Sequence, residues 1–131
     1  QYIYFDKDGM VLRSTGEELP DIPLFETKTM TTFTIYEEVK MEDEELLGQI
    51  MNLANLFQHY GVDWSRVIFD NNNAAYLYAG EIQVKLGKKD SYDEQISALS
   101  SVLAKAQEEQ LSGEIDMTNY HFKGDIILKK K

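Results

Sequence analysis

Gly80-Glu81-Ile82-Gln83-Val84-Lys85-Leu86-Gly87 is the stretch of sequence that decides the fold. Its first two residues predict a tight turn, and apolar residues then alternate with polar ones over 82–86. Because successive side chains of a strand point to opposite faces, one face of this strand packs inward while the other meets water. A sheet of this kind needs helices to cover its apolar face.

Two amphipathic helices are predicted, one on each side of this strand in the sequence. The first follows acidic residues at 42–45, which suit the positive end of a helix dipole, and Gly61 ends it. Its apolar stripe is Leu46, Ile50, Leu53, Phe57 and Tyr60. The second helix runs to about Gln110 and begins with Ser91 and Glu94, the spacing of a capping box. Its inward stripe is Tyr92, Ile96, Leu99, Leu103 and Ala106.

The other elements are predicted to be strands. Residues 1–5 and 10–12 indicate a hairpin around an Asp-rich turn, and 13–28, with Pro20 and Pro23, indicate a long surface loop. A half-buried strand is expected within 29–39, and further strands at 66–70, 74–79, 114–118 and from Gly124 to about Lys129. We therefore predict an α+β domain over 1–131, with a mainly antiparallel sheet and two helices packed on one face.

Composition excludes several classes of function. The chain has 131 residues with a net charge of −10, which argues against binding nucleic acid, because Lys and Arg supply most of the affinity for phosphates. It contains no cysteine, so a disulfide framework and a thiolate metal site are excluded. It begins directly on a predicted strand without a methionine, so we expect a further segment upstream.

No residue pattern predicts a catalytic, metal or cofactor site. Asp6, Asp8 and Gly9 superficially resemble the start of a calcium loop, in which an acidic residue, Glu17, stands at the twelfth position only when Asp6 is counted as the first. His59 and His121 lie in separate elements, without a second His at ligand spacing. The acidic residues at 37–45 are interpreted as the solvated start of a helix.

The predicted last strand is unusually apolar for a terminus, with Ile126, Ile127 and Leu128 in succession. Two interpretations remain open: the lysines at 129–131 protect an exposed sheet edge, or a partner adds a strand to it. We favour docking. Residues 120–131 hold four Lys and one Asp, a local charge of +3, which favours an acidic partner segment and predicts weaker binding at higher salt.

Four segments, taken in order, carry a resemblance over nearly the whole chain: Tyr4-Phe5-Asp6-Lys7-Asp8-Gly9-Met10-Val11, Leu19-Pro20-Asp21-Ile22-Pro23-Leu24, Val84-Lys85-Leu86-Gly87 and Glu114-Ile115-Asp116-Met117. Their order and spacing resemble the FtsQ/DivIB family of bacterial cell-division proteins. The resemblance implies the β domain of that family, with the membrane helix and the POTRA domain expected upstream of this chain.

The resemblance further implies a non-enzymatic scaffold of the divisome, without a cofactor. It is anchored in the cell membrane by a single pass, with this domain on the extracytoplasmic side at the division septum. There it binds FtsB/DivIC and FtsL for septum assembly, and the partner adds a strand beside the last strand of the β domain. The same edge also allows two chains to pair with each other. The matching positions are Tyr120, His121 and Phe122 in the turn, and Gly124, Asp125, Ile126, Ile127 and Leu128 in the strand.

An alternative function is an extracytoplasmic glycan-binding or hydrolytic domain that uses acidic residues with Trp64, Tyr76 and Tyr78. It requires two carboxylates in a cleft or an exposed aromatic platform. A spacer domain is the second alternative, and it requires a covered last strand. The scaffold function differs from both alternatives because it requires a terminal sheet edge that is unpaired.

Overall fold

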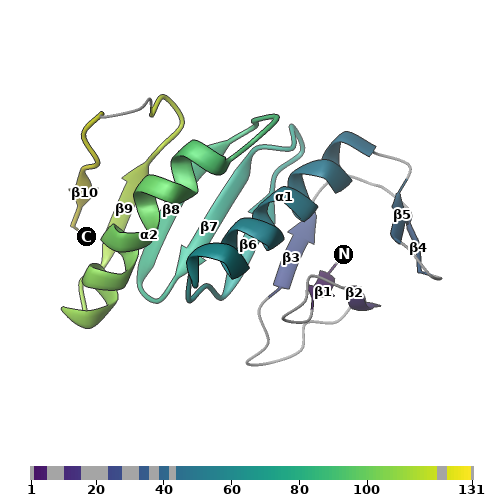
Figure 1. Cartoon of the computed structure of the whole chain (residues 1–131), viewed down its shortest axis with the longest axis horizontal. Helices are drawn as coiled ribbons and strands as arrows, with labels where there is room; N and C mark the ends of the chain where they lie inside the picture. Colours follow the sequence, from purple (N-terminus) through teal and green to yellow (C-terminus); the bar gives the residue numbers. More distant parts are fainter. Residues whose placement is uncertain are drawn as a thin grey trace.

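The computed structural model describes residues 2–5, 11–15, 24–27, 33–35, 39–41, 44–120 and 124–130. Two helices and ten strands lie within these ranges (Figure 1). The helices are α1 (Glu44–Tyr60) and α2 (Asp93–Glu108). The strands are β1 (Tyr2–Phe5), β2 (Val11–Thr15), β3 (Leu24–Thr27), β4 (Phe33–Ile35), β5 (Val39–Met41), β6 (Arg66–Phe69), β7 (Ala75–Ala79), β8 (Ile82–Gly87), β9 (Gly113–Asp116) and β10 (Leu128–Lys129).

Eight of the strands form one sheet in the order β10-β9-β8-β7-β6-β3-β1-β2. Five neighbouring pairs are antiparallel, and two pairs, β3 with β6 and β8 with β9, are parallel. The prediction of an α+β fold is confirmed, whereas the mainly antiparallel sheet holds only in part, because the sheet is mixed. Each parallel pair encloses a helix in the sequence, since parallel neighbours need a long crossover connection.

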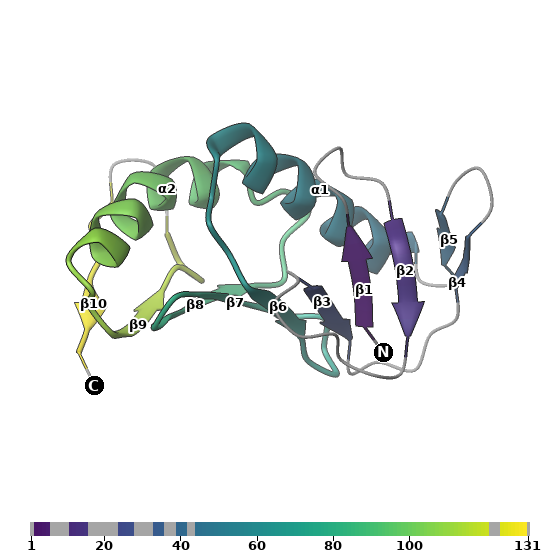
Figure 2. The same ribbon diagram turned by 90° about the horizontal axis from the view of Figure 1, so that it is seen from below.

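Both helices cover the same face of the sheet (Figure 2). Topology explains this arrangement. Strands β3 and β8 point in the same direction, because one parallel and two antiparallel pairings separate them. Both crossovers then step the same way along the sheet, from β3 to β6 and from β8 to β9. When two right-handed crossovers start from strands of the same direction and step the same way along the sheet, their helices lie on the same face.

The core lies between this face and the helices. Leu46, Ile50, Leu53 and Phe57 of α1 are buried, as predicted. Tyr60 is 40% exposed, so its predicted inward position is wrong; it is the last residue of α1, where the helix gives way to Gly61. All five residues of the predicted inward stripe on the second helix are buried: Tyr92, Ile96, Leu99, Leu103 and Ala106.

The predicted surface loop over 13–28 is wrong at both ends. Strand β2 continues to Thr15, and β3 lies inside the sheet between β1 and β6. Phe25 of β3 is fully buried and packs on Phe57 of α1 and Phe69 of β6. Four residues are too few to show a period, and the parallel partner of β3 follows about forty residues later, so local pattern alone misses this strand.

The strand predicted within 29–39 is confirmed in part, as β4 at 33–35, while 29–32 and 36–38 lie outside the described residues. Strands β4 and β5 form a small antiparallel sheet of their own, with Phe33 opposite Met41 and Ile35 opposite Val39. Alternation indicates a strand but does not say which strand is its partner. The predicted hairpin near the start is present as β1 and β2.

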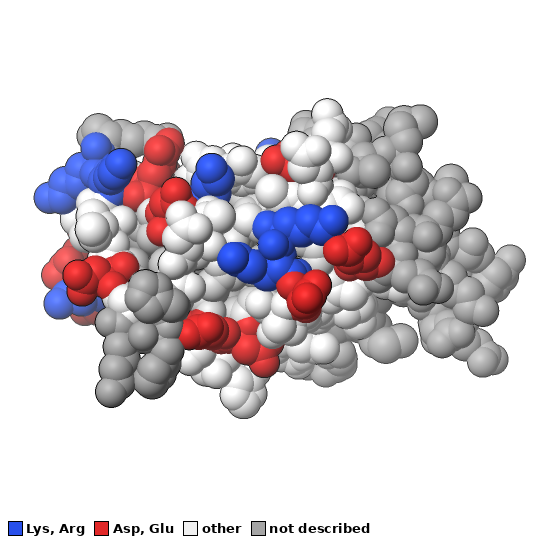
Figure 3. Space-filling view, turned by 90° about the horizontal axis from the view of Figure 1, so that it is seen from above, with Lys and Arg blue, Asp and Glu red and all other residues white. Residues whose placement is uncertain are grey.

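Charged side chains of both signs mingle on the surface. The view in Figure 3 shows Lys and Arg beside Asp and Glu across the described part of this face. Lys88 illustrates the pattern, since its Nζ lies 3.2 Å from Glu45 Oε1 at the start of α1. Although the net charge is −10, the acidic side chains on this face do not form one continuous patch.

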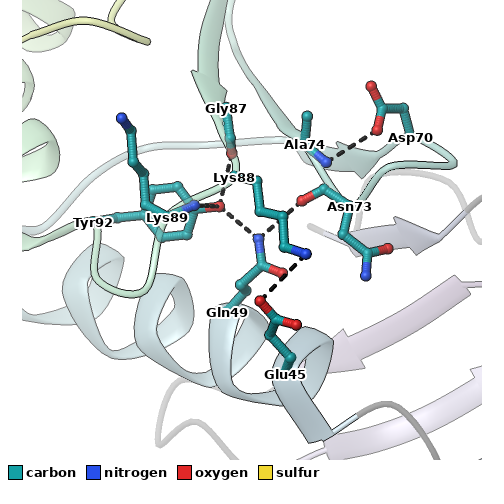
Figure 4. A network of polar contacts seen from close by, with 9 residues as sticks. All are labelled: Glu45, Gln49, Asp70, Asn73, Ala74, Gly87, Lys88, Lys89 and Tyr92. Atoms are coloured by element: carbon teal, nitrogen blue, oxygen red, sulfur yellow. Dashed lines mark hydrogen bonds and ion pairs between the residues drawn. The ribbon is translucent and has the colours of Figure 1, made fainter.

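A buried polar network joins α1 to the ends of the central strands (Figure 4). The Tyr92 hydroxyl donates to the Gly87 carbonyl at 2.8 Å and accepts from Gln49 Nε2 at 2.7 Å. Gln49 Nε2 also donates to the Asn73 carbonyl at 2.9 Å. One amide and one hydroxyl thus link α1, the turn between β6 and β7, and the connection into α2.

The start of α2 differs from the predicted capping box. Ser91 Oγ donates to Asp93 Oδ1 at 2.7 Å and accepts the Asp93 N–H at 3.3 Å, but the N-cap residue is Tyr92, which has no side-chain cap. The Tyr92 N–H donates to Asn52 Oδ1 of α1 at 2.8 Å. Packing of the tyrosine against α1 therefore sets where α2 begins, one residue later than the capping pattern predicts.

Replacing Tyr92 by Phe is expected to lower the free energy of unfolding by about 1–3 kcal/mol, because buried partners on Gly87 and Gln49 are left unsatisfied. Burial raises the pKa of Tyr92, so its hydroxyl ionises at a lower pH in the unfolded chain than in the folded one. The stabilisation is present below pH about 10 and is lost as pH rises through the folded-state pKa. Denaturant unfolding of the unaltered protein and the variant, at neutral pH and above pH 10, measures both free energies of unfolding. The prediction is contradicted if the free energy falls equally in both proteins as pH rises.

Candidate partner-binding edge

Strand β10 lies at one edge of the eight-stranded sheet (Figure 1). It pairs with β9 in antiparallel fashion, with Leu128 opposite Ile115 and Lys129 opposite Glu114. Among the strands that the structure describes, none pairs with the other side of β10. That side therefore presents backbone groups that an additional strand could bind.

The last strand is shorter than predicted. Only Leu128 and Lys129 form the ladder, whereas the predicted strand began at Gly124. Strand β9 ends at Asp116, whose Oδ1 accepts the Thr118 N–H at 2.9 Å, and the chain turns there. Residues 124–127 consequently have no ladder partner on β9.

Residues 124–129 nevertheless keep the side-chain alternation of a strand. Ile126 and Leu128 are half-buried and pack against the core. Asp125, Ile127 and Lys129 are exposed, and Ile127 is 69% exposed. The segment is held to the domain on one face while its other face is open.

The open face of this segment lines a groove of about 380 Å³ on the side of the sheet away from the helices. Cross-strand pairing brings the groove residues together: Tyr76 lies opposite Lys85 and Lys85 opposite Asp116, and Gln83 lies opposite Glu114. The groove is completed by Asp125, Ile127 and Lys129. It therefore combines an aromatic ring, an exposed aliphatic side chain and charges of both signs.

Asp116 is held as a carboxylate inside this groove. Hydrogen bonding from Thr118 keeps the pKa of Asp116 below its ordinary value, and the positive charges of Lys85 and Lys129 act in the same direction. Lys129 thus has acidic neighbours within its own domain, since it lies opposite Glu114 and its charge acts on Asp116. Glu114 and Asp116 therefore offset part of the charge that Lys129 contributes to the terminal segment.

A buried glutamine on α2 fixes the strands that carry the edge. Gln95 is 4% exposed, and its Nε2 donates to the Leu86 carbonyl at 2.9 Å and to the Met117 carbonyl at 2.8 Å. One side chain therefore ties together the ends of β8 and β9. Ile115 and Met117 are buried beneath α2, so β9 is firmly placed.

The predicted site residues are only partly brought together. Tyr120 is half-buried against the core, so its ring is not wholly free to serve as an anchor. His121 and Phe122 lie outside the described residues. The positions from Gly124 to Leu128 do lie at the edge, and Asp125 and Ile127 face the groove.

Sequence reasoning missed the groove residues contributed by the neighbouring strands, namely Lys85, Glu114 and Asp116. Each is the polar member of an alternating strand, which is the usual solvent-facing position. Their proximity depends on the parallel register between β8 and β9. Tyr76, which stood out as part of an aromatic pair, does line the groove.

The three aromatic residues of the glycan-binding alternative do not share a surface. The Trp64 ring packs against Phe25 and Phe57 at centroid distances of 4.9 Å, on the helix side of the sheet. Tyr76 and Tyr78 lie on the opposite face, because their neighbours Ala75, Leu77 and Ala79 point into the core.

The described part of the chain holds neither a metal-binding cluster nor a candidate membrane span. No group of three or more His, Cys, Asp or Glu side chains there could hold a metal ion. No helix there combines the length and apolar composition that crossing a bilayer requires.

Comparison with known proteins adds no relative: no family model, no curated protein and no solved structure matches this chain.

Replacing Gly113 by Ala is expected to loosen the edge strand. Gly113 has φ of 149°, and a Cβ there would overlap the backbone carbonyl of Lys129. We expect β10 to move off β9, seen as altered chemical shifts and faster hydrogen exchange in both strands, with a loss of about 1–3 kcal/mol in unfolding free energy.

The matched control is Gly48→Ala in α1, where a Cβ meets nothing within 4 Å. That substitution should stabilise the domain by about 0.5–1 kcal/mol and leave β10 unchanged. Unaltered spectra of β9 and β10 in the Gly113 variant would contradict the described packing.

Proposed function

We propose that this chain is the partner-binding domain of a bacterial cell-division scaffold of the FtsQ/DivIB kind, without catalytic activity of its own. It binds FtsB/DivIC by strand addition at the free side of β10, in a complex that also contains FtsL. The observation that carries the proposal is the one-sided pairing of β10, which has β9 on one side and no described strand on the other.

Physical features of the edge support strand addition. An added strand gains backbone hydrogen bonds from groups that are otherwise solvated, and its alternate side chains give specificity. Ile126 and Leu128 hold the segment to the core from one face, so the edge does not need to fold when it binds. Preorganisation of this kind reduces the entropy lost on association.

The chemistry of the groove supports binding rather than hydrolysis. A general acid for glycoside cleavage needs a carboxyl group with a raised pKa. Asp116, the carboxylate between Lys85 and Lys129, has its pKa displaced in the opposite direction. It suits an ion pair or a hydrogen bond with a partner better than proton donation.

The proposal also assigns a location. In the full-length protein this domain lies outside the cytoplasmic membrane at the division septum, behind a single membrane-spanning helix and a POTRA domain. The support for this location is the resemblance in segment order and spacing. Fractionation of the full-length protein, with protease accessibility of this domain, tests it directly.

Calorimetry with the extracytoplasmic fragment of FtsB/DivIC from the same organism tests the binding function. The Gly113 and Met117 N–H groups bond to β8, so Glu114 faces β10, and the backbone of its partner Lys129 points to β9. Because backbone direction alternates along a strand, the N–H of Ile126 points to the free side, and Ile126→Pro removes this donor at an edge where proline is tolerated in a folded domain. We expect affinity to fall by about tenfold, because a backbone hydrogen bond to the partner strand is lost.

Ile126→Val keeps the backbone donor and a branched side chain, so its affinity should change by less than about twofold. If the proline variant bound as tightly as the unaltered protein, the edge would not be the site. If the unaltered protein did not bind this fragment, the proposed function itself would be wrong.

A further inference from the structure

The outward face of residues 125–129 carries a defined order of chemistry. Asp125, Ile127 and Lys129 are all exposed and all line the groove, so they share one face at a spacing of two residues. Along the chain this face reads acidic, apolar, basic. Ile127 at its centre is 69% exposed, the largest exposed fraction among the large hydrophobic residues that the structure describes.

We infer that the partner strand runs antiparallel to this segment and carries an acidic, an apolar and a basic residue at alternate positions, in that order. The inference rests on the proposed strand addition. Directly opposite side chains on one face of a sheet interact, and opposite charges are favourable there whereas like charges are not. An acidic residue then faces Lys129, an apolar residue faces Ile127, and a basic residue faces Asp125.

The order of charges expected in the partner depends on the direction of pairing. In antiparallel pairing the first residue of the partner motif meets the last residue of this segment, so the acidic residue comes first. Parallel pairing requires the reverse order and gives a slightly less stable ladder. Strand β10 already pairs in the antiparallel sense with β9 on its other side.

The segment also matches its own pattern, because Asp125, Ile127 and Lys129 in one copy complement Lys129, Ile127 and Asp125 in another. A second copy is thus the principal competitor for the edge. Each copy has a net charge of −10, so self-pairing brings two strongly negative bodies together. This repulsion favours a different partner as the occupant.

Two short capped peptides of identical composition test the inference. In the first, glutamate, valine and lysine follow one another with one threonine between each pair, and in the second their order is reversed. Amide chemical shifts of the full chain are followed as each peptide is added at low salt. The first peptide should shift resonances of 125–129 and bind at least about fivefold more tightly than the second. The preference should shrink as salt is raised.

Exchanging the two charges in the protein gives the second part of the peptide experiment. The double variant Asp125→Lys with Lys129→Asp keeps the net charge and reverses the order, so it should prefer the reversed peptide. The control variant, Lys105→Glu with Glu109→Lys, makes a like exchange at the same spacing on exposed residues, one in the last turn of α2 and the other its C-cap. It should keep the original preference.

Equal binding of both peptides at 125–129 would overturn the charge order but leave strand addition intact. Preference for the reversed peptide by the unaltered protein would overturn the antiparallel direction. Sedimentation of the chain alone as a dimer that the charge exchange does not change, with no peptide bound at the edge, would make a second copy the occupant. Absence of shifts at 125–129 with either peptide and with the FtsB/DivIC fragment would remove the proposed function as well.

Discussion

The parallel pairing of β8 with β9 is the interaction on which the rest of this end of the molecule depends. Strand β10 has β9 as its partner, and β9 in turn is placed by β8 and by α2, which connects them. Gln95 closes this unit, because one buried amide donates to the Leu86 carbonyl near the end of β8 and to the Met117 carbonyl just after β9. A buried amide must find partners, so the helix and the two strand ends are held in one arrangement.

The terminal edge combines features that protect it with features that suit docking. A ladder of two residues is short, and lysines follow it, and both devices limit unwanted pairing between sheets. Residues 124–127 keep the alternation of a strand but have no partner on β9. Their inward side chains pack on the core, while the outward ones face a groove with charges of both signs. The two interpretations of the lysines are therefore compatible with one structure.

Prediction from sequence succeeded where the pattern was local and long. Helix α1, helix α2 and strand β8 each carry a period over many residues, and the buried residues follow it closely. It failed at β3, whose four residues are recognisable only beside β6, and at the start of α2, where Asn52 on α1 competes for the Tyr92 N–H. In each failure a partner distant in the sequence decided the local structure.

The sequence by itself determined the fold class, the two helices, the face that each helix buries and the place of an edge near residue 128. These follow from hydrophobic periodicity and turn chemistry, which act over a few residues. Only the tertiary structure decided that the sheet is mixed, that the ladder of the last strand is reduced to Leu128 and Lys129, and that Lys85, Glu114 and Asp116 meet Asp125 and Ile127 in one groove. Register between strands brings those side chains together, and register is a property of pairs of segments that no single segment contains.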